Sequence, residues 1–285
     1  MPSPVADMMT LAVRASFGSP MPPWLDAETA WTLPAILALA LLYCAGAARL
    51  LHRARAGRAA TLARALAFLA GIAILLAATT GPLHDAGQWS LAAHMGQHML
   101  LVALVPPLLL LGRPGVTMAQ ALPSHRGRHA HRAWRGIGDR LARALVPAAA
   151  VQMAVIGFWH HPGAMTATLF DLRLHALMHA SFLISGLWLW QALLWRIREP
   201  RAGIVPALVV IVAMMMQMGL LGALLTFSAR LLYPVCSARA AARGLDALGD
   251  QQLAGLIMWV PACLPYLIGG LWLLYRGFGR AGRGN

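Results

Sequence analysis

Seven long apolar runs constrain this chain more than any other feature of its sequence. Each is close to the ~20 residues that a helix needs to cross a bilayer. Backbone polar groups cannot stay unpaired in lipid, so the runs are expected to be helices. Only 11% of the residues are charged, against roughly 25% in soluble proteins. The predicted fold is therefore an all-α integral membrane protein, a bundle of seven transmembrane helices. The predicted spans are residues 31–48, 65–82, 90–111, 144–159, 172–195, 204–227 and 253–275.

Charged residues divide unevenly between the two sides that these spans would separate. All 23 basic residues are arginine; 18 fall on one side, and seven of the nine acidic residues fall on the other. Short arginine clusters between apolar runs indicate membrane topology and contact with lipid headgroups, not nucleic acid. The positive-inside rule places the N-terminus outside and the C-terminus in the cytoplasm. The predicted parts are an extracytoplasmic segment (1–30), a transmembrane domain (31–275) and a basic cytoplasmic tail (276–285).

Histidines mark one depth of the predicted bundle. His94 and His98 lie one and two turns into the third span, and His175 and His179 occupy the matching positions of the fifth. Residues four apart share a helix face, so each pair points in one direction. A rise of about 1.5 Å per residue puts both pairs roughly 6 to 12 Å below the outer helix ends. Four imidazoles are therefore expected to meet in one layer near the outer membrane surface.

This set of side chains suits a soft or borderline metal ion. Two histidines four apart can bind one metal from a single helix, and a facing pair completes a four-nitrogen site. Imidazole suits copper and zinc, and thioether sulfur favours Cu(I). Met95 and Met178 lie beside the histidines, and no carboxylate lies in the middle of a span. The sequence thus predicts a copper site, with Cu(I) favoured over zinc or haem.

Less specific interpretations apply to several of these residues. A lone histidine in a helix is usually a hydrogen-bonded packing residue, and methionine commonly fills gaps in apolar interiors. For His84 and His160, which sit at span edges, passing metal inward and simple solvation are both open. Asp250 would lie at the outer start of the last span, where the helix dipole favours a carboxylate. The two depth-matched pairs remain the strongest indication of function, because ionisable groups inside a membrane are costly.

Four stretches occur in an order typical of a known family. They are HMGQHMLLVALVPPLLLLGRP from residue 94, WHHPGAMTATLFDLRLHALMHASFLISGLWLW from 159, GLLGALLTFSARLLYP from 219 and DQQLAGLIMWVP from 250. Across residues 30–275 the chain resembles the polytopic CtaG family of bacterial cytochrome c oxidase assembly factors. The resemblance implies a seven-span protein of the bacterial cytoplasmic (inner) membrane, needed to make active haem–copper oxidase. Carried over by position, it points to His94, His98, His160, His175, His179, Asp250 and Gln251, with His161 as an additional histidine beside His160.

The function predicted from these observations is transfer of copper, so the protein is not expected to be an enzyme. It would receive copper from a periplasmic donor and deliver it to a nascent haem–copper oxidase subunit. The rival interpretation is a membrane-bound di-metal or haem oxidoreductase that uses the HxxxH pairs. Di-iron desaturases generally need an HxxHH box, which this chain lacks, whereas a single haem between the two pairs stays open. The full set of predicted metal-binding residues is His84, His94, His98, His160, His175, His179, Met95, Met178 and Asp250.

Overall fold

The structure, a computed structural model, describes residues 23–53, 57–80, 82–199 and 203–281. Within these ranges the chain forms helices and no strand, which confirms the all-α prediction. The first half contains α2 (Pro23–Arg53), α3 (Arg58–Thr80), α4 (Pro82–Gly87), α5 (Leu91–Met99), η1 (Leu100–Leu104), α6 (Val105–Leu111), α7 (Pro114–Ala119) and α8 (Ser124–Arg143). The second half contains α9 (Leu145–Trp159), α10 (Pro162–Thr168), α11 (Leu172–Arg198), α12 (Val205–Phe227), α13 (Pro234–Ala242) and α14 (Ala247–Ala281).

Six helical stretches in the described residues are long and apolar enough to cross a membrane. They are α2, α3, the run from α5 through α6, α11, α12 and α14. The fourth predicted span coincides with α9, which has only 15 residues. The preceding helix, α8, bends away from α9 by 80°. The chain therefore has six candidate spans, or seven if α8 and α9 together make one crossing.

The first and last helices, α2 and α14, are longer than the spans predicted for them. α2 begins at Pro23, a residue type favoured at the first helical position. Residues 23–30, predicted as part of an extracytoplasmic segment, thus continue the first helix, and residues 1–22 of that segment lie outside the described residues. α14 runs on to Ala281, past the predicted span end at residue 275. Of the predicted basic tail, residues 282–285 lie outside the described residues.

A π-helical turn, η1, interrupts the third span directly after His98 and Met99. Pro106 and Pro107 follow it, and because proline has no backbone N–H they cannot donate the hydrogen bonds of a regular helix. The neighbouring helix α11 packs tightly against this span at Gly186. A Cβ there would lie 3.0 Å from the Val102 carbonyl oxygen and 2.9 Å from Cγ of Pro106. Because Gly186 has no side chain, the backbone of α11 can lie directly against Val102 and Pro106 of the other histidine-bearing span.

Small residues also set the contact between α12 and α14. A Cβ on Gly222 would lie 2.7 Å from the Gly255 carbonyl oxygen and 2.9 Å from Cβ of Trp259. A Cβ on Gly255 would collide with the Gly222 carbonyl oxygen and with the Thr226 side chain. Close approach through small residues is a common way for helices to associate in a membrane. This contact fixes α14, whose first turn reaches the histidine-bearing helix α5.

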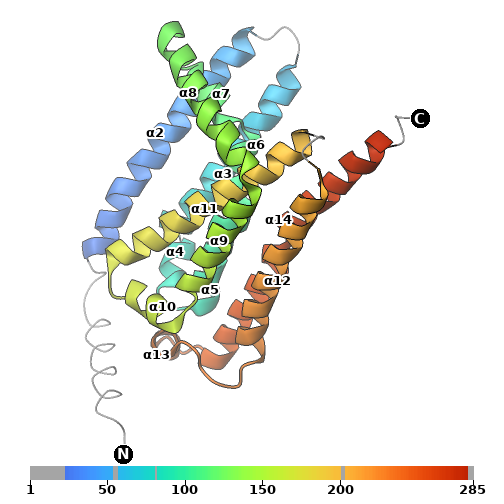
Figure 1. The fold of residues 1–285 in the computed structure, drawn as a ribbon. Helices are drawn as coiled ribbons and strands as arrows, with labels where there is room; N and C mark the ends of the chain where they lie inside the picture. The colour runs from blue at the N-terminus through green and yellow to red at the C-terminus, as the bar shows by residue number, and fades with distance from the viewer. Residues whose placement is uncertain (1–22, 54–56, 81, 200–202, 282–285) are drawn as a thin grey trace, which may run out of the picture.

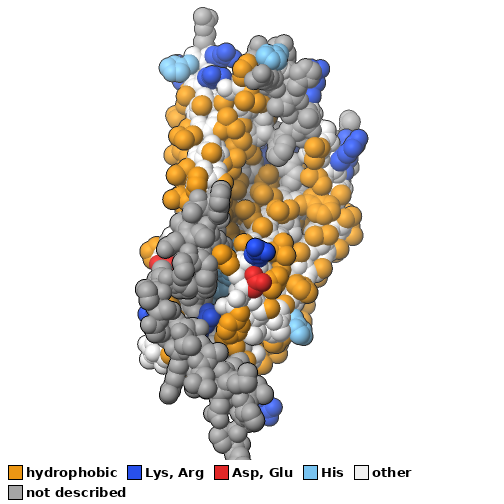
Figure 2. All heavy atoms as spheres, turned by 90° about the vertical axis from the view of Figure 1, so that its left-hand side faces the viewer, with side chains coloured by type: hydrophobic (Ala, Val, Ile, Leu, Met, Phe, Trp, Pro, Cys, Tyr) orange, Lys and Arg blue, Asp and Glu red, His pale blue; other side chains and the backbone are white. Residues whose placement is uncertain are grey.

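The two ends of the bundle carry different elements. α4, α10 and α13 lie at the end where α2 begins, whereas α8 lies at the other end, where α14 finishes (Figure 1). On the face shown in Figure 2, hydrophobic side chains form a broad zone along the helices, and arginine and histidine side chains gather at the α8 end. α2 starts and α14 finishes at opposite ends, which agrees with seven crossings if α8 and α9 together make one. We refer to these ends as the α10 end and the arginine-rich end.

Candidate metal centre

Two carboxylates fix the starts of the histidine-bearing helices. Asp250, in the first turn of α14, accepts hydrogen bonds from the Ser90 hydroxyl at 2.6 Å and from the Leu91 N–H at 2.6 Å. Ser90 is itself the N-cap of α5 and accepts from the Ala93 N–H. At the start of α11, Asp171 plays the cap role and accepts from two backbone N–H groups. Both helices therefore begin at defined positions, which sets the depth of the histidines one and two turns later.

The structure brings the four paired histidines together. Within α5 the ring centres of His94 and His98 lie 4.3 Å apart, and within α11 those of His175 and His179 lie 4.2 Å apart. Across the two helices the rings of His94 and His175 are 5.8 Å apart, and those of His98 and His179 are 5.7 Å apart. None of the four side chains is more than 6% exposed. The expected layer of imidazoles thus exists, at the α10 end of the bundle.

Two further histidines join this layer. His84, on α4, is 2% exposed, and its ring lies 5.8 Å from that of His175. His160, which follows α9, is also buried; its ring lies 6.1 Å from that of His98, and its Nδ1 donates to the Ile156 carbonyl at 2.7 Å. Simple solvation therefore does not describe either residue. We refer to these six residues as the histidine cluster: His84, His94, His98, His160, His175 and His179.

His161, next to His160 in the chain, lies outside the cluster. It is exposed, and its Nδ1 accepts a hydrogen bond from the Gly163 N–H at 3.3 Å, which caps the short helix α10. His160 instead points inward, and the Tyr233 hydroxyl donates to its backbone carbonyl at 2.7 Å. The structure thus places His160 in the histidine cluster and His161 outside it, a distinction that the sequence alone did not provide.

Several ring nitrogens of the cluster lack a hydrogen-bond partner within the described residues. Both nitrogens of His98 and His179 are in this state, as is Nε2 of His160. A neutral imidazole has one N–H donor and one acceptor. Leaving a buried polar group unpaired costs about 1–3 kcal/mol, so such groups in a native structure call for a ligand or water. Five such nitrogens lie close together here, so the cluster is a candidate site for a ligand that accepts nitrogen donors.

The distances between the rings agree only in part with coordination of one metal ion. Two imidazoles bound to one ion hold their ring centres about 5 to 6 Å apart, given metal–nitrogen bonds of about 2 Å. The separations across the helices fall in this range, whereas the separations within each pair are shorter. Among the described residues no group of three or more His, Cys, Asp or Glu side chains is arranged to hold one ion. The donors fit a metal by type and proximity, and coordination by three or four of them requires the rings to rotate toward one point.

The predicted accessory residues have other contacts in the structure. Asp250 lies in the first turn of its own helix, as the sequence suggested, and its carboxylate is also engaged by the start of α5. Gln251 holds the loop between α12 and α13, donating to the Arg230 carbonyl and accepting from the Leu232 N–H. Met95 and Met178 are fully buried in the core, where thioether side chains pack well.

Sequence reasoning missed two neighbours of the cluster. Gln97 is fully buried, donates to the Ala78 carbonyl at 2.7 Å and lies 3.3 Å from Nδ1 of His84. Phe182, one turn beyond His179, places its ring 4.7 Å from that of His98. The position of Gln97 inside HMGQHM, between two buried histidines, was the available signal, because an amide in a span needs partners. These residues support and shield the rings.

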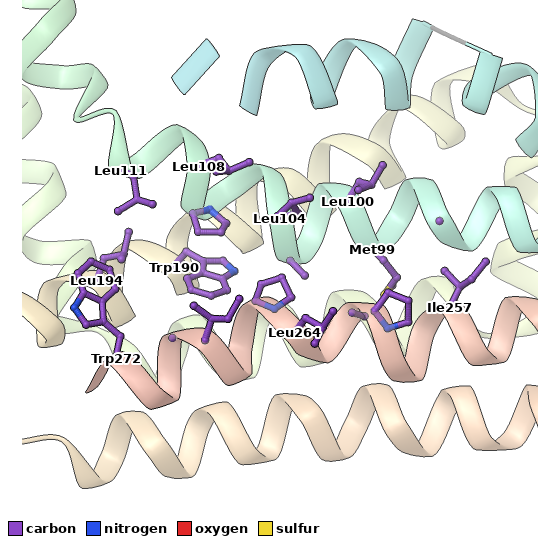
Figure 3. A pocket seen from close by; sticks show the side chains of 18 of the residues that line it. Met99, Leu100, Leu104, Leu108, Leu111, Trp190, Leu194, Ile257, Leu264 and Trp272 are labelled. Atoms are coloured by element: carbon purple, nitrogen blue, oxygen red, sulfur yellow. The ribbon is translucent and has the colours of Figure 1, made fainter. Parts of the chain in front are cut away.

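An apolar groove runs along the span that carries His94 and His98 (Figure 3). The groove has a volume of about 550 Å³ and runs between the α5–η1–α6 span and α14, with Trp190 of α11 on its wall. Gly96 and Met99 line its beginning, and Leu111 and Trp272 line its far end. No histidine lines it, so it is a feature distinct from the cluster.

Together these features define a class: a multi-span helical membrane protein with a buried histidine cluster at one end of its bundle. A family model described as cytochrome c oxidase caa3 assembly factor (Caa3_CtaG) matches residues 41–279. Because the match covers most of the chain, the protein belongs to this family of oxidase assembly factors. No curated protein and no solved structure is significantly similar to the chain.

Proposed function

We propose that this assembly factor binds copper at the histidine cluster and delivers it to a nascent subunit of the oxidase. The family accounts for the role in oxidase assembly and for an interaction with an oxidase subunit. The choice of metal is supported by the donor type, since neutral imidazoles, with thioethers in the same helices, suit copper and above all Cu(I). Copper is cargo in this proposal, so the site needs to bind and release it.

The observation that carries the proposal is the set of five buried ring nitrogens, on His98, His179 and His160, without a partner in the described chain. A packing role alone would leave their desolvation uncompensated. A catalytic role would call for acid or base groups beside the metal. The carboxylate of Asp250 is held by the α5 backbone, and that of Asp171 by the first N–H groups of α11. A carrier therefore suits the cluster better than the oxidoreductase alternative, and we propose that the protein is not an enzyme.

The proposed transfer depends on how the bundle is oriented in the membrane. The arginine-rich end would face the cytoplasm and the α10 end the periplasm of a bacterial inner membrane. Copper from a periplasmic donor would then reach the cluster without crossing the bilayer. α13 packs against α5 and α14 at this end, so access to the buried rings requires local movement there.

The test compares two double variants that each remove two histidines. His94→Ala with His98→Ala acts on the cluster, and His52→Ala with His125→Ala acts on exposed histidines near the arginine-rich end. The purified proteins are loaded with Cu(I) and their metal content is measured. Cells that lack the wild-type gene then receive each variant, and the copper and haem of the oxidase are measured.

We expect the cluster variant to lose copper and to yield oxidase that contains haem but too little copper. The exposed-histidine variant should match the wild type in both measurements. X-ray absorption of the loaded wild type should show nitrogen ligands at about 2 Å. Full oxidase activity with the cluster variant under copper limitation would refute copper delivery and leave a scaffold role. A haem spectrum in the purified wild type would favour the alternative haem protein.

A further inference from the structure

A small pocket lined in part by arginine lies at the arginine-rich end, far from the histidine cluster. It has a volume of about 60 Å³ and lies between α2, α3 and α7. Arg64 and Arg113 line it together with the hydroxyl-bearing side chains of Thr61 and Thr117. A water molecule takes about 30 Å³ in the liquid, so the pocket has room for a small anionic group. Two guanidinium groups offer many N–H donors to such a group.

The positive charge of this pocket comes from its arginine side chains. Within the described residues no carboxylate pairs with Arg64 or with Arg113. A third arginine, Arg198 at the end of α11, is close enough to be repelled by both of them. Gathering three like charges at one place is unfavourable unless an anion joins them. The arrangement therefore points to an anionic ligand.

The backbone of Arg113 adds an independent observation. It has φ 51° and ψ 55°, and it is the one residue other than glycine with positive φ among the described residues. This left-handed conformation is costly for a side chain such as arginine, and glycine would avoid the cost. Strained residues tend to lie at binding sites, where the surrounding structure holds them. Position 113 thus has an arginine although its backbone conformation favours glycine, which indicates a role for the arginine side chain.

The wall of the pocket is rigid enough to hold this conformation. Tyr43 stacks on Phe68 with ring centres 3.8 Å apart, and its hydroxyl donates to the Gly112 carbonyl at 2.8 Å. A Cβ on Gly112 would lie 2.6 Å from Cβ of Phe68, so the chain passes close to α3 just before Arg113. The backbone carbonyl of Arg113 then accepts from the N–H groups of Val116 and Thr117. The guanidinium group is therefore presented from a fixed turn.

We propose that this pocket binds the phosphate group of an anionic phospholipid. The pocket lies at the ends of spans, where headgroups are found, and basic pockets between helices on the cytoplasmic side are suited to anionic headgroups. The apolar groove of Figure 3 ends at Leu111, two residues before Arg113, so apolar surface for an acyl chain lies nearby. This site is separate from copper handling and does not depend on it.

The experiment uses the full-length protein and two double variants with the same change in net charge. Arg64→Gln with Arg113→Gln removes the pocket arginines. Arg135→Gln with Arg140→Gln removes exposed arginines of α8 at the same end. Each protein is reconstituted with phosphatidylcholine alone or mixed with phosphatidylglycerol, re-extracted, and examined by native mass spectrometry for retained lipid.

We expect the wild type and the α8 variant to retain phosphatidylglycerol, and the pocket variant to retain it about tenfold less. Arg113→Gly serves as a second variant, because glycine accepts the left-handed backbone. It should fold with an unchanged or higher melting temperature and still lose the lipid. Equal retention by the two double variants, or retention by Arg113→Gly, would overturn the proposal. Stabilisation by inorganic phosphate without retained lipid would also overturn it, by identifying a soluble anion as the ligand.

Discussion

The carboxylate of Asp250 holds the N-cap of the histidine-bearing helix, accepting a 2.6 Å hydrogen bond from the Ser90 hydroxyl across 160 positions of sequence. It also accepts from the Leu91 N–H at 2.6 Å. α14 thereby fixes where α5 begins, and the first cluster histidine, His94, lies less than one turn beyond Leu91. The link connects the packing of the last helix to the position of the metal-binding candidates.

Asp250→Asn is expected to weaken this link without removing a metal ligand. The amide keeps its size but loses the charge-assisted acceptor, which costs about 1–2 kcal/mol of stability. The melting temperature of the purified protein should fall by several degrees, while Cu(I) bound per protein stays at the wild-type level. Unchanged stability together with lost copper would show instead that the carboxylate coordinates the ion.

His160 and His161 give a matched pair of single variants. His160→Ala removes a buried ring 6.1 Å from that of His98, whereas His161→Ala removes an exposed ring that caps α10. We expect His160→Ala to lower retained copper and oxidase copper content, and His161→Ala to leave both at the wild-type level. Measurement of both variants at equal protein accumulation separates loss of a ligand from loss of protein. The opposite ranking would assign the functional role to His161.

The contact between α12 and α14 predicts a large difference between two glycine substitutions. Gly255→Leu would force a side chain against the Gly222 backbone and Thr226, so the helices must separate. Gly136→Ala, on α8, adds a Cβ that meets nothing within 4 Å. The first variant should accumulate poorly and melt at a much lower temperature, and the second should match the wild type. Normal melting of Gly255→Leu would contradict the close packing of α12 and α14.

The histidine layer could be predicted from sequence because it rests on local rules. The four-residue spacing fixes a face of the helix, and the distance from the helix start fixes depth. The number of spans followed from the length of the apolar runs, apart from the bend between α8 and α9. That bend depends on the polar side of α8, which is rich in arginine and cannot enter the apolar region.

The remaining features of the site depend on contacts between distant segments. Sequence patterns gave His84 and His160 as span-edge residues, and only the packing of α4 and α9 against α11 places their rings inside the cluster. The partner of Asp250 likewise lies on another helix. The left-handed turn at Arg113 leaves no mark in the sequence, because glycine or asparagine is the usual signal for such a turn.

Cys236 is expected to be unreactive in the folded protein. It lies in α13, outside the membrane spans, and burial raises its pKa to about 12. The thiolate is the reactive and metal-binding form, and at neutral pH it would be fewer than roughly one in ten thousand molecules. N-ethylmaleimide should therefore modify Cys236 only after denaturation, as read by mass spectrometry of peptides. Rapid modification of the native protein would reopen a role for this thiol in receiving copper.

The orientation of the bundle decides whether the cluster can receive copper from outside the cell. The arginine asymmetry predicts that the C-terminus lies in the cytoplasm. A cytoplasmic-active reporter fused after Arg283 should therefore be active, and the same reporter inserted at the exposed Gly244, between α13 and α14, should be inactive. A periplasmic-active reporter should give the reverse pattern at the two positions. If the patterns are exchanged, the α10 end faces the cytoplasm, and the copper reaching His94 and His98 would have to come from a cytoplasmic source.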